Sequence, residues 1–278
     1  MRASAIVILI FSALLVVASY NSIGPFHFLS EWRAKYKSGL RRSVDKMEYQ
    51  IYDCSDNLDP FITIDFLKGA HFWHPQVAIW IESVEGEYIK SLLVTTSTAK
   101  GIFYGGRTAE NFKDFDQHKS GSHDEVRRVN ALPHWAFTRN VKAKDGLYAP
   151  HPDEPLPDGI TGATPSGNFR FFAERHVPTT LDSFVVKMEI NVAFDENKFY
   201  SAYDYLDDDA YHSGTGLLGQ PSLIYSSTVI KQNPSAYYLM ELIGHGHHSG
   251  QNGAVYNDLS QITTAKEIVE RILVKMNW

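Results

Sequence analysis

The feature that most constrains the fold is a series of short segments rich in β-branched and aromatic residues, separated by Gly, Pro, Asn and Asp. Such segments are typical of β-strands, and the residues between them are typical of turns. Glu85-Gly86 lies between two of them, where glycine supplies the positive φ that a hairpin turn requires. The sequence therefore predicts an all-β fold, an immunoglobulin-like sandwich with long loops. The predicted strands are 61–67, 77–82, 88–95, 169–173, 184–192, 223–230 and 237–243.

Two long polar stretches, 100–157 and 195–221, interrupt this rhythm. Loops of this length usually carry function or face a partner. At the carboxyl end, apolar residues from Ile262 to Met276 fit a helical period, whereas Ile272 to Met276 also fit a last strand. The sequence leaves the type of this element open.

The amino-terminal residues are apolar and uncharged from Ala3 to Tyr20. They predict a signal peptide or membrane anchor over 1–20, because an apolar run of this length fits both. Residues 21–50 are predicted to form a juxtamembrane helical linker, which either packs on the domain or docks at the membrane interface. The β-domain then covers 51–278. We expect a periplasmic protein, anchored to the inner membrane through this apolar helix or secreted after signal cleavage.

Composition and charge exclude several classes of function. The formal net charge is −6, and the basic residues form no continuous stripe in the β-domain, so nucleic-acid binding is not expected. Cys54 is the only cysteine, which excludes an intramolecular disulfide and a cysteine-based metal cluster. The chain has no Gly-x-Ser-x-Gly elbow, phosphate loop or dinucleotide fingerprint. Whether the protein is an enzyme is left open.

The segment 158–165 reads Asp-Gly-Ile-Thr-Gly-Ala-Thr-Pro. Its form, Asp-x-x-Ser/Thr-Gly-Ala-Thr, resembles the acceptor site at which periplasmic flavin transferases attach FMN through a phosphoester to the last threonine. The resemblance makes Thr164 the acceptor and places Thr161 at the Ser/Thr position. The alternative is a structural turn, because Asp-Gly and Thr-Gly are ordinary turn formers.

The neighbours of Thr164 bear on how a transferase would reach it. Gly162 and Ala163 are small and keep the approach to the hydroxyl open, and Asp158 could help to place the metal or phosphate at the transferase site. Pro165 restrains Thr164 to extended conformations.

A second glycine-rich segment, 244–250, contains His245, His247 and His248. Imidazole is the commonest protein ligand for zinc and copper, so these side chains are candidates for a divalent metal site. No carboxylate lies beside them at metal-ligand spacing. The alternative is a glycine-rich hairpin whose histidines are partly buried and hydrogen-bonded.

Several segments together resemble a family of predicted periplasmic proteins, domain of unknown function 2271. The resemblance runs from about Val77 to the carboxyl terminus and implies a secreted or membrane-anchored β-sandwich similar to immunoglobulin-like domains. It also implies a gene neighbourhood of PepSY membrane proteins and flavin transferases. The segments that carry it are 77–82, 132–135, 158–165, 219–225, 244–250 and 263–265.

Two functions remain in view. In the first, the protein is a membrane-associated redox carrier with covalent FMN on Thr164, stacked by Trp135 and Phe169. Its partners would be a flavin transferase and a PepSY-type or other inner-membrane redox protein. In the second, it is a non-catalytic accessory or binding module that docks a membrane partner. That module could hold a metal through the three histidines.

Overall fold

The computed structural model describes residues 50–52, 61–104, 125–157, 161–173, 181–201, 203–208, 210–211, 219–232 and 237–277. These residues all belong to one compact unit, Tyr49–Trp278. The expected signal or anchor over 1–20, and nearly all of the expected linker over 21–50, lie outside the described residues. Within the described ranges, no helix is both long enough and apolar enough to cross a membrane.

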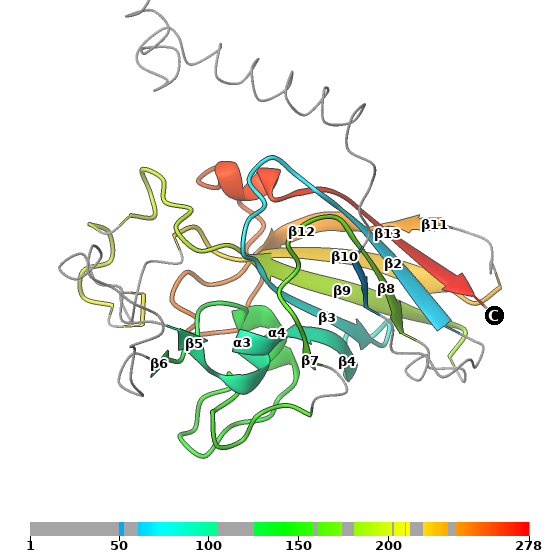
Figure 1. Ribbon diagram of the computed structural model, residues 1–278, viewed down its shortest axis with the longest axis horizontal. Coiled ribbons are helices and arrows are strands. Elements are labelled where there is room, and N and C mark those ends of the chain that lie inside the picture. The colour runs from blue at the N-terminus through cyan, green and yellow to red at the C-terminus, as the bar shows by residue number, and fades with distance from the viewer. Residues whose placement is uncertain are drawn as a thin grey trace, which may run out of the picture. The chain divides into compact units, whose positions relative to one another are not determined.

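Two β-sheets make up most of this unit, which confirms the predicted all-β class (Figure 1). The first sheet contains, in spatial order, β1 (Gln50–Tyr52), β8 (Phe169–Ala173), β2 (Phe61–Lys68), β13 (Val269–Asn277) and β11 (Tyr237–Leu239). The second contains β12 (Glu241–His245), β10 (Leu223–Ile230), β9 (Ser183–Asn191), β3 (Gln76–Glu82), β4 (Tyr88–Thr95) and β7 (Thr161–Gly162). A separate short ladder pairs β5 (Phe103–Tyr104) with β6 (Glu125–Val126). Neighbouring strands are antiparallel except for the pairs β1–β8 and β4–β7.

The main core lies between the two sheets. Alternate residues of the strands point into it, as the period-two pattern of the sequence predicts. From the first sheet come Ile64 and Phe66, and Phe66 stacks on Phe169 with ring centroids 4.7 Å apart. Val77 and Ile79 on β3 contribute from the second sheet. The sheets therefore form a sandwich around one continuous apolar cluster.

A second, smaller core covers the outer face of the second sheet. Two short helices, α3 (Thr96–Lys100) and α4 (Pro133–Thr138), lie against β3 and β4 there (Figure 1). The fully buried rings of Trp80 and Trp135 belong to this core, together with Ala99 on α3. Because β3 is covered on both faces, its residues from Val77 to Glu82 are all buried. Neither helix was predicted: α3 follows directly after the predicted strand 88–95, and α4 lies within the polar stretch 100–157.

The predicted strand 237–243 is wrong as a single strand. The chain crosses from one sheet to the other at Met240, so β11 pairs with β13 in the first sheet and β12 pairs with β10 in the second. Met240 is buried between them, and its N–H donates to the Ile272 carbonyl at 3.0 Å. An apolar residue at the crossing continues the strand pattern, so the break is not visible in the sequence.

The carboxyl-terminal element, whose type the sequence leaves open, contains both a helical turn and a strand. Ile262, Ala265 and Ile268 are buried because a single turn of 3-10 helix, Thr264–Glu267, carries the chain across the end of the core. The chain then enters β13, where alternate residues from Ile272 onward point inward. The helical period was therefore produced by one short turn followed by a strand.

The connections that could carry function gather at one end of the second sheet. Gln76 at the start of β3 lies opposite Asn191 at the end of β9, and Leu223 at the start of β10 lies opposite Ile190 and His245. Strand β4 also ends there, at the start of α3. The segment carrying Thr164 and the histidine-containing turn therefore belong to the same end of the sandwich as α3.

Candidate functional site

The segment that leads to Thr164 follows the edge of the second sheet. Thr161 and Gly162 form β7, which pairs in parallel with the end of β4, opposite Val94 and Thr95. Strand β7 is the outermost strand on this side of the sheet. The backbone that precedes the predicted acceptor is therefore fixed by ladder hydrogen bonds to a buried strand.

Two side-chain hydrogen bonds hold the same segment. The Thr96 hydroxyl, at the start of α3, donates to the Gly162 carbonyl at 2.8 Å. The Thr161 hydroxyl donates to the Pro157 carbonyl at 3.0 Å. Asp158, the first residue of the acceptor pattern, lies outside the described residues. The remainder of the pattern is anchored to α3 on one side and to the preceding loop on the other.

Exposure changes residue by residue after β7. Ala163 is exposed, Thr164 is partly exposed, and Pro165 is buried. The predicted cofactor residues Thr161, Gly162, Ala163 and Thr164 thus form one short stretch that begins in the sheet and ends at a buried proline. This arrangement presents the Thr164 side chain on a backbone that is held on both sides.

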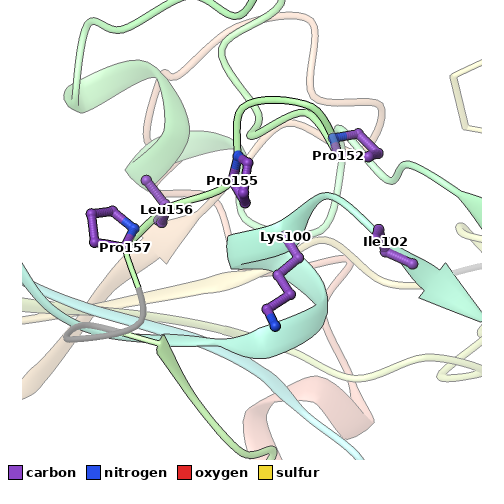
Figure 2. Close-up of a pocket in the computed structure, with 6 residues that line it drawn as sticks. All are labelled: Lys100, Ile102, Pro152, Pro155, Leu156 and Pro157. Atoms are coloured by element: carbon purple, nitrogen blue, oxygen red, sulfur yellow. The ribbon is translucent and has the colours of Figure 1, made fainter.

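A cavity of about 430 Å³ lies beside this segment (Figure 2). One wall comes from the end of α3 and the residues after it, and the other comes from the loop that leads into the acceptor pattern. The Leu156 N–H donates to the Ala99 carbonyl at 2.9 Å and ties the two walls together. The lining residues are Lys100, Ile102, Pro152, Pro155, Leu156 and Pro157.

Gly101 holds the first of these walls in place. It ends α3 in the left-handed conformation, with φ of 64°, and a Cβ added there would lie 2.3 Å from the Pro150 carbonyl oxygen. We expect Gly101→Ala to destabilise the protein by about 1–3 kcal/mol, because both the φ value and the contact oppose a side chain. The control is Gly146→Ala, where φ is 83° but a Cβ meets nothing within 4 Å. Thermal unfolding should show the larger loss for Gly101→Ala, and equal losses would contradict the close approach.

The structure places Trp135 inside the protein. Its ring is fully buried in the second core, and its indole Nε1–H donates to the Ser91 hydroxyl at 2.8 Å. The Arg139 guanidinium lies 4.9 Å from the ring centroid. Phe169 is also fully buried, in the main core. Neither ring presents a face to a molecule at the surface, so the expected stacking of a flavin on Trp135 or Phe169 is corrected to two core-packing roles.

A fully buried carboxylate, Glu189 on β9, is a site that the sequence analysis missed. Its Oε1 accepts the Ser222 hydroxyl at 2.5 Å and the His134 N–H at 3.2 Å, and its Oε2 accepts the Trp135 N–H at 2.7 Å. The two N–H groups belong to the first turn of α4, where backbone donors lack partners within the helix. Burial raises the pKa of Glu189 to about 7, against the opposing effect of these hydrogen bonds. Glu189 therefore joins α4 to the second sheet.

The histidine-containing turn closes over this carboxylate. The Gly246 N–H donates to the Ser222 carbonyl at 2.9 Å, and a Cβ on Gly246 would lie 2.6 Å from the Ser222 hydroxyl oxygen and 3.2 Å from Glu189 Oε1. Only glycine allows this approach. The structure thus assigns part of the 244–250 segment to covering the buried network.

A second buried carboxylate, Glu82, lies on the neighbouring strand. It accepts the Trp80 indole N–H at 2.7 Å and pairs with the Lys187 ammonium at 2.8 Å. Lys187 also lies 3.4 Å from His134 Nε2, while His134 Nδ1–H donates to the Gly253 carbonyl at 2.7 Å. Burial lowers the pKa of His134, which keeps the ring neutral. These contacts satisfy the polar groups that lie beneath α4.

Both carboxylates are visible in the sequence as acidic residues in predicted strands, but such residues can be either buried or exposed. Glu82 and Glu189 each follow apolar residues in a predicted strand, at positions that a surface strand would expose. Both are buried because helices cover the outer face of the sheet. Because α3 and α4 were not predicted, the alternating pattern of these strands predicts that the two carboxylates face solvent.

The three candidate metal ligands each contact a different polar group. His245 Nδ1 lies 2.7 Å from the Gly246 carbonyl and must donate to it, which leaves Nε2 as an acceptor. His247 Nδ1 accepts the Ser249 N–H at 3.2 Å, so the proton of the neutral ring is on Nε2. His248 Nε2 lies 3.7 Å from Asp208 Oδ2. His245 and His247 therefore both use Nδ1 for hydrogen bonds within the turn.

Aromatic stacking accounts for much of the packing of this turn. The rings of His247 and His248 stack with centroids 4.4 Å apart, and Tyr205 stacks on His248 at 3.9 Å. His245 stacks on Tyr256 at 5.4 Å. Among the residues that the structure describes, no group of three or more His, Cys, Asp and Glu side chains has the arrangement of a metal site. Metal binding by the three histidines stays a prediction.

No family model, curated protein or solved structure matches this chain. The resemblance to domain of unknown function 2271 therefore stays a prediction as well, and the functional argument depends on the site itself.

Proposed function

We propose that this protein is an extracytoplasmic, membrane-associated electron-transfer protein that carries FMN covalently on Thr164. The observation that carries the proposal is the position of the acceptor pattern. Thr164 is partly exposed, its backbone is anchored through β7 and Pro165, and a cavity of about 430 Å³ lies next to the segment. Cavities that bind small molecules have volumes of about 300–1,000 Å³.

The residues around Thr164 fit the attachment reaction. A transferase must bring a phosphate of FAD to the threonine hydroxyl, and the exposed Ala163 beside it carries only a methyl group. The hydrogen bonds from Thr96 and Thr161 hold the preceding backbone without using the Thr164 hydroxyl. Bound FMN would supply one- and two-electron chemistry, and the protein would position it.

The proposal extends to the setting of the reaction. The apolar residues 3–20 support export or anchoring, and the resemblance supports a flavin transferase and a PepSY-type or other inner-membrane redox protein as partners. The two-sheet architecture supports the immunoglobulin-like reading of the sandwich.

The experiment that tests the proposal is the intact mass of the protein exported from cells that contain a flavin transferase. We expect the mass of the polypeptide plus one FMN moiety, ultraviolet fluorescence of the band in a denaturing gel, and the added mass on the peptide that contains Thr164. A matched preparation from cells without the transferase should be unmodified. An unmodified mass in both preparations would make segment 158–165 a structural turn.

The second candidate is an accessory module that docks a membrane partner. It is favoured by an apolar stripe on β11 and β12, where Tyr237, Leu239 and Ile243 are 59%, 54% and 37% exposed. Both strands lie at the edges of their sheets, and exposed apolar edge strands tend to pair with other chains. This candidate takes precedence if the exported protein carries no flavin.

A further inference from the structure

We propose that the cavity beside α3 holds the isoalloxazine ring of the flavin, and that Lys100 supplies the positive charge that raises its reduction potential. The inference rests on the proposed attachment of FMN to Thr164 and gives a binding site for the ring. Trp135 and Phe169 cannot form that site, because both are fully buried. It goes beyond the attachment itself, because a tethered flavin could also lie free in solvent.

The walls of the cavity are preformed. Pro152, Pro155 and Pro157 have fixed φ values, which reduces the conformational entropy that binding would cost. Pro152 lies within a tight turn, in which the Glu154 N–H donates to the His151 carbonyl at 2.9 Å, and Pro155 follows this turn directly. A rigid wall of this kind is suited to a planar ring.

The chemistry of the lining matches an isoalloxazine ring. Ile102, Leu156 and the three prolines offer apolar contacts for its flat faces, and Lys100 offers one charged donor for its polar edge. None of the six lining residues is acidic. The acidic residues of the adjacent turn are engaged elsewhere, since Asp153 pairs with Lys144 and Glu154 accepts the Lys144 N–H at 3.0 Å.

The acceptor segment and the cavity are joined through the same helix. Thr96 at the start of α3 binds Gly162, two residues before Thr164, and Lys100 ends the helix four residues later. Four residues of helix span about 6 Å. Pro157, which lines the cavity (Figure 2), immediately precedes the acceptor pattern in the sequence. Thr161, three residues before Thr164, donates its hydroxyl to the carbonyl of Pro157, so a flexible ribityl phosphate chain on Thr164 would start close to the cavity wall.

Lys100 acts through its charge. Two electrons and one proton convert the oxidised ring to the anionic hydroquinone, and a nearby ammonium group stabilises that anion more than the neutral oxidised ring. In a redox titration of the flavin-loaded protein, dithionite supplies the electrons and water the proton. We expect Lys100→Met to shift the midpoint potential by about 30 mV or more towards negative values, a tenfold change in the equilibrium of a two-electron couple.

The control for charge is Lys275→Met, on β13 in the other sheet, which should leave the potential unchanged. Lys100→Arg keeps the charge and should retain most of the wild-type potential. Equal potentials for Lys100→Met and the wild type would overturn the role of Lys100, even though the protein carries FMN.

The cavity is tested independently of covalent attachment. Thr164→Val protein, which has no acceptor hydroxyl, is titrated with free riboflavin, and binding is followed by flavin fluorescence. We expect binding that is at least tenfold weaker when Ile102→Trp fills the cavity, with thermal unfolding as the check that this variant folds. If riboflavin does not bind, or binds equally to both proteins, the cavity is not the seat of the ring. An unmodified wild-type mass overturns the attachment to Thr164 instead, so the two failures are distinct.

Discussion

Replacing Thr164 with valine is expected to remove all covalently bound flavin, while Thr164→Ser retains it. The phosphoester requires a side-chain hydroxyl, which serine has and valine lacks. Valine has nearly the shape of threonine and the same β-branched backbone preference, and the site is only partly buried. The variant should therefore fold as the wild type does. In-gel ultraviolet fluorescence and intact mass of the co-expressed proteins measure the result.

The control for this substitution is the other threonine of the pattern. Thr161 uses its hydroxyl as a donor to the Pro157 carbonyl and lies in β7, so it serves the backbone of the site. Peptide mapping of the wild type should place the added mass on Thr164 and leave Thr161 unmodified. A fluorescent Thr164→Val protein with the mass on Thr161 would show that the acceptor has been misassigned. A fluorescent protein with no modified threonine in this peptide would end the proposal.

The strands were predictable because each buries alternate residues against one core. Strands β4, β8 and β10 have the predicted bounds at both ends, β2 and β3 differ by one residue at one end, and β9 differs by one residue at both ends. Gly86 has the positive φ expected of the hairpin turn, 89°. The period of two identifies these strands without knowledge of their partners, since the inward side chains need only a common apolar interior.

The outer layer could not be predicted in the same way. Helix α4 has only six residues, too few to show a helical period. The N–H of Trp135 in its first turn donates to Glu189, which lies 54 residues further along the chain. The pairing depends on contacts between distant residues, which no local pattern records. The same limit applies to the candidate site, because Lys100 and Leu156 become neighbours only when α3 and the later loop meet.

The proposed acceptor pattern is recognisable from the sequence because such a site requires a fixed local run of residues. The residues that would contact a flavin ring form no such run, and the sequence alone favours Trp135 only as a large aromatic ring. Its burial follows from the second core, which needs a large ring between α4 and the sheet. The cavity that we propose for the ring has proline and leucine walls, whose composition alone is typical of an ordinary loop.

Replacing Glu189 with alanine is expected to destabilise the protein by about 3 kcal/mol or more. The substitution leaves two N–H groups of α4 and the Ser222 hydroxyl buried without their acceptor, and each such group costs about 1–3 kcal/mol. The matched control is Glu270→Ala on β13, an exposed carboxylate in the other sheet, for which a much smaller loss is expected. Chemical denaturation of both variants measures the difference, and equal losses would contradict the role of Glu189 as the link to α4.

The pH dependence of stability reports the ionisation of the same group. Burial raises the pKa of Glu189 from an ordinary value of 4.5 to about 7 in the folded protein. Between these values the folded state holds a proton that the unfolded state has released. The stabilisation is therefore fully present below pH 4.5 and is lost as the pH rises through 7, by on the order of 3 kcal/mol. Glu189→Gln cannot ionise and should lack this loss.

The difference between the wild type and Glu189→Gln isolates this contribution. His134, His247 and His248 have pKa values lowered by burial, so their contribution runs the other way and is lost as the pH falls below 6.5. It is common to both proteins and cancels in the difference. Parallel stability curves between pH 5 and 8 would mean that the three hydrogen bonds keep Glu189 ionised throughout.

Because Trp135 on α4 packs in the same core as Ala99 and Leu156, weakening the link between Glu189 and α4 should also weaken riboflavin binding in the cavity.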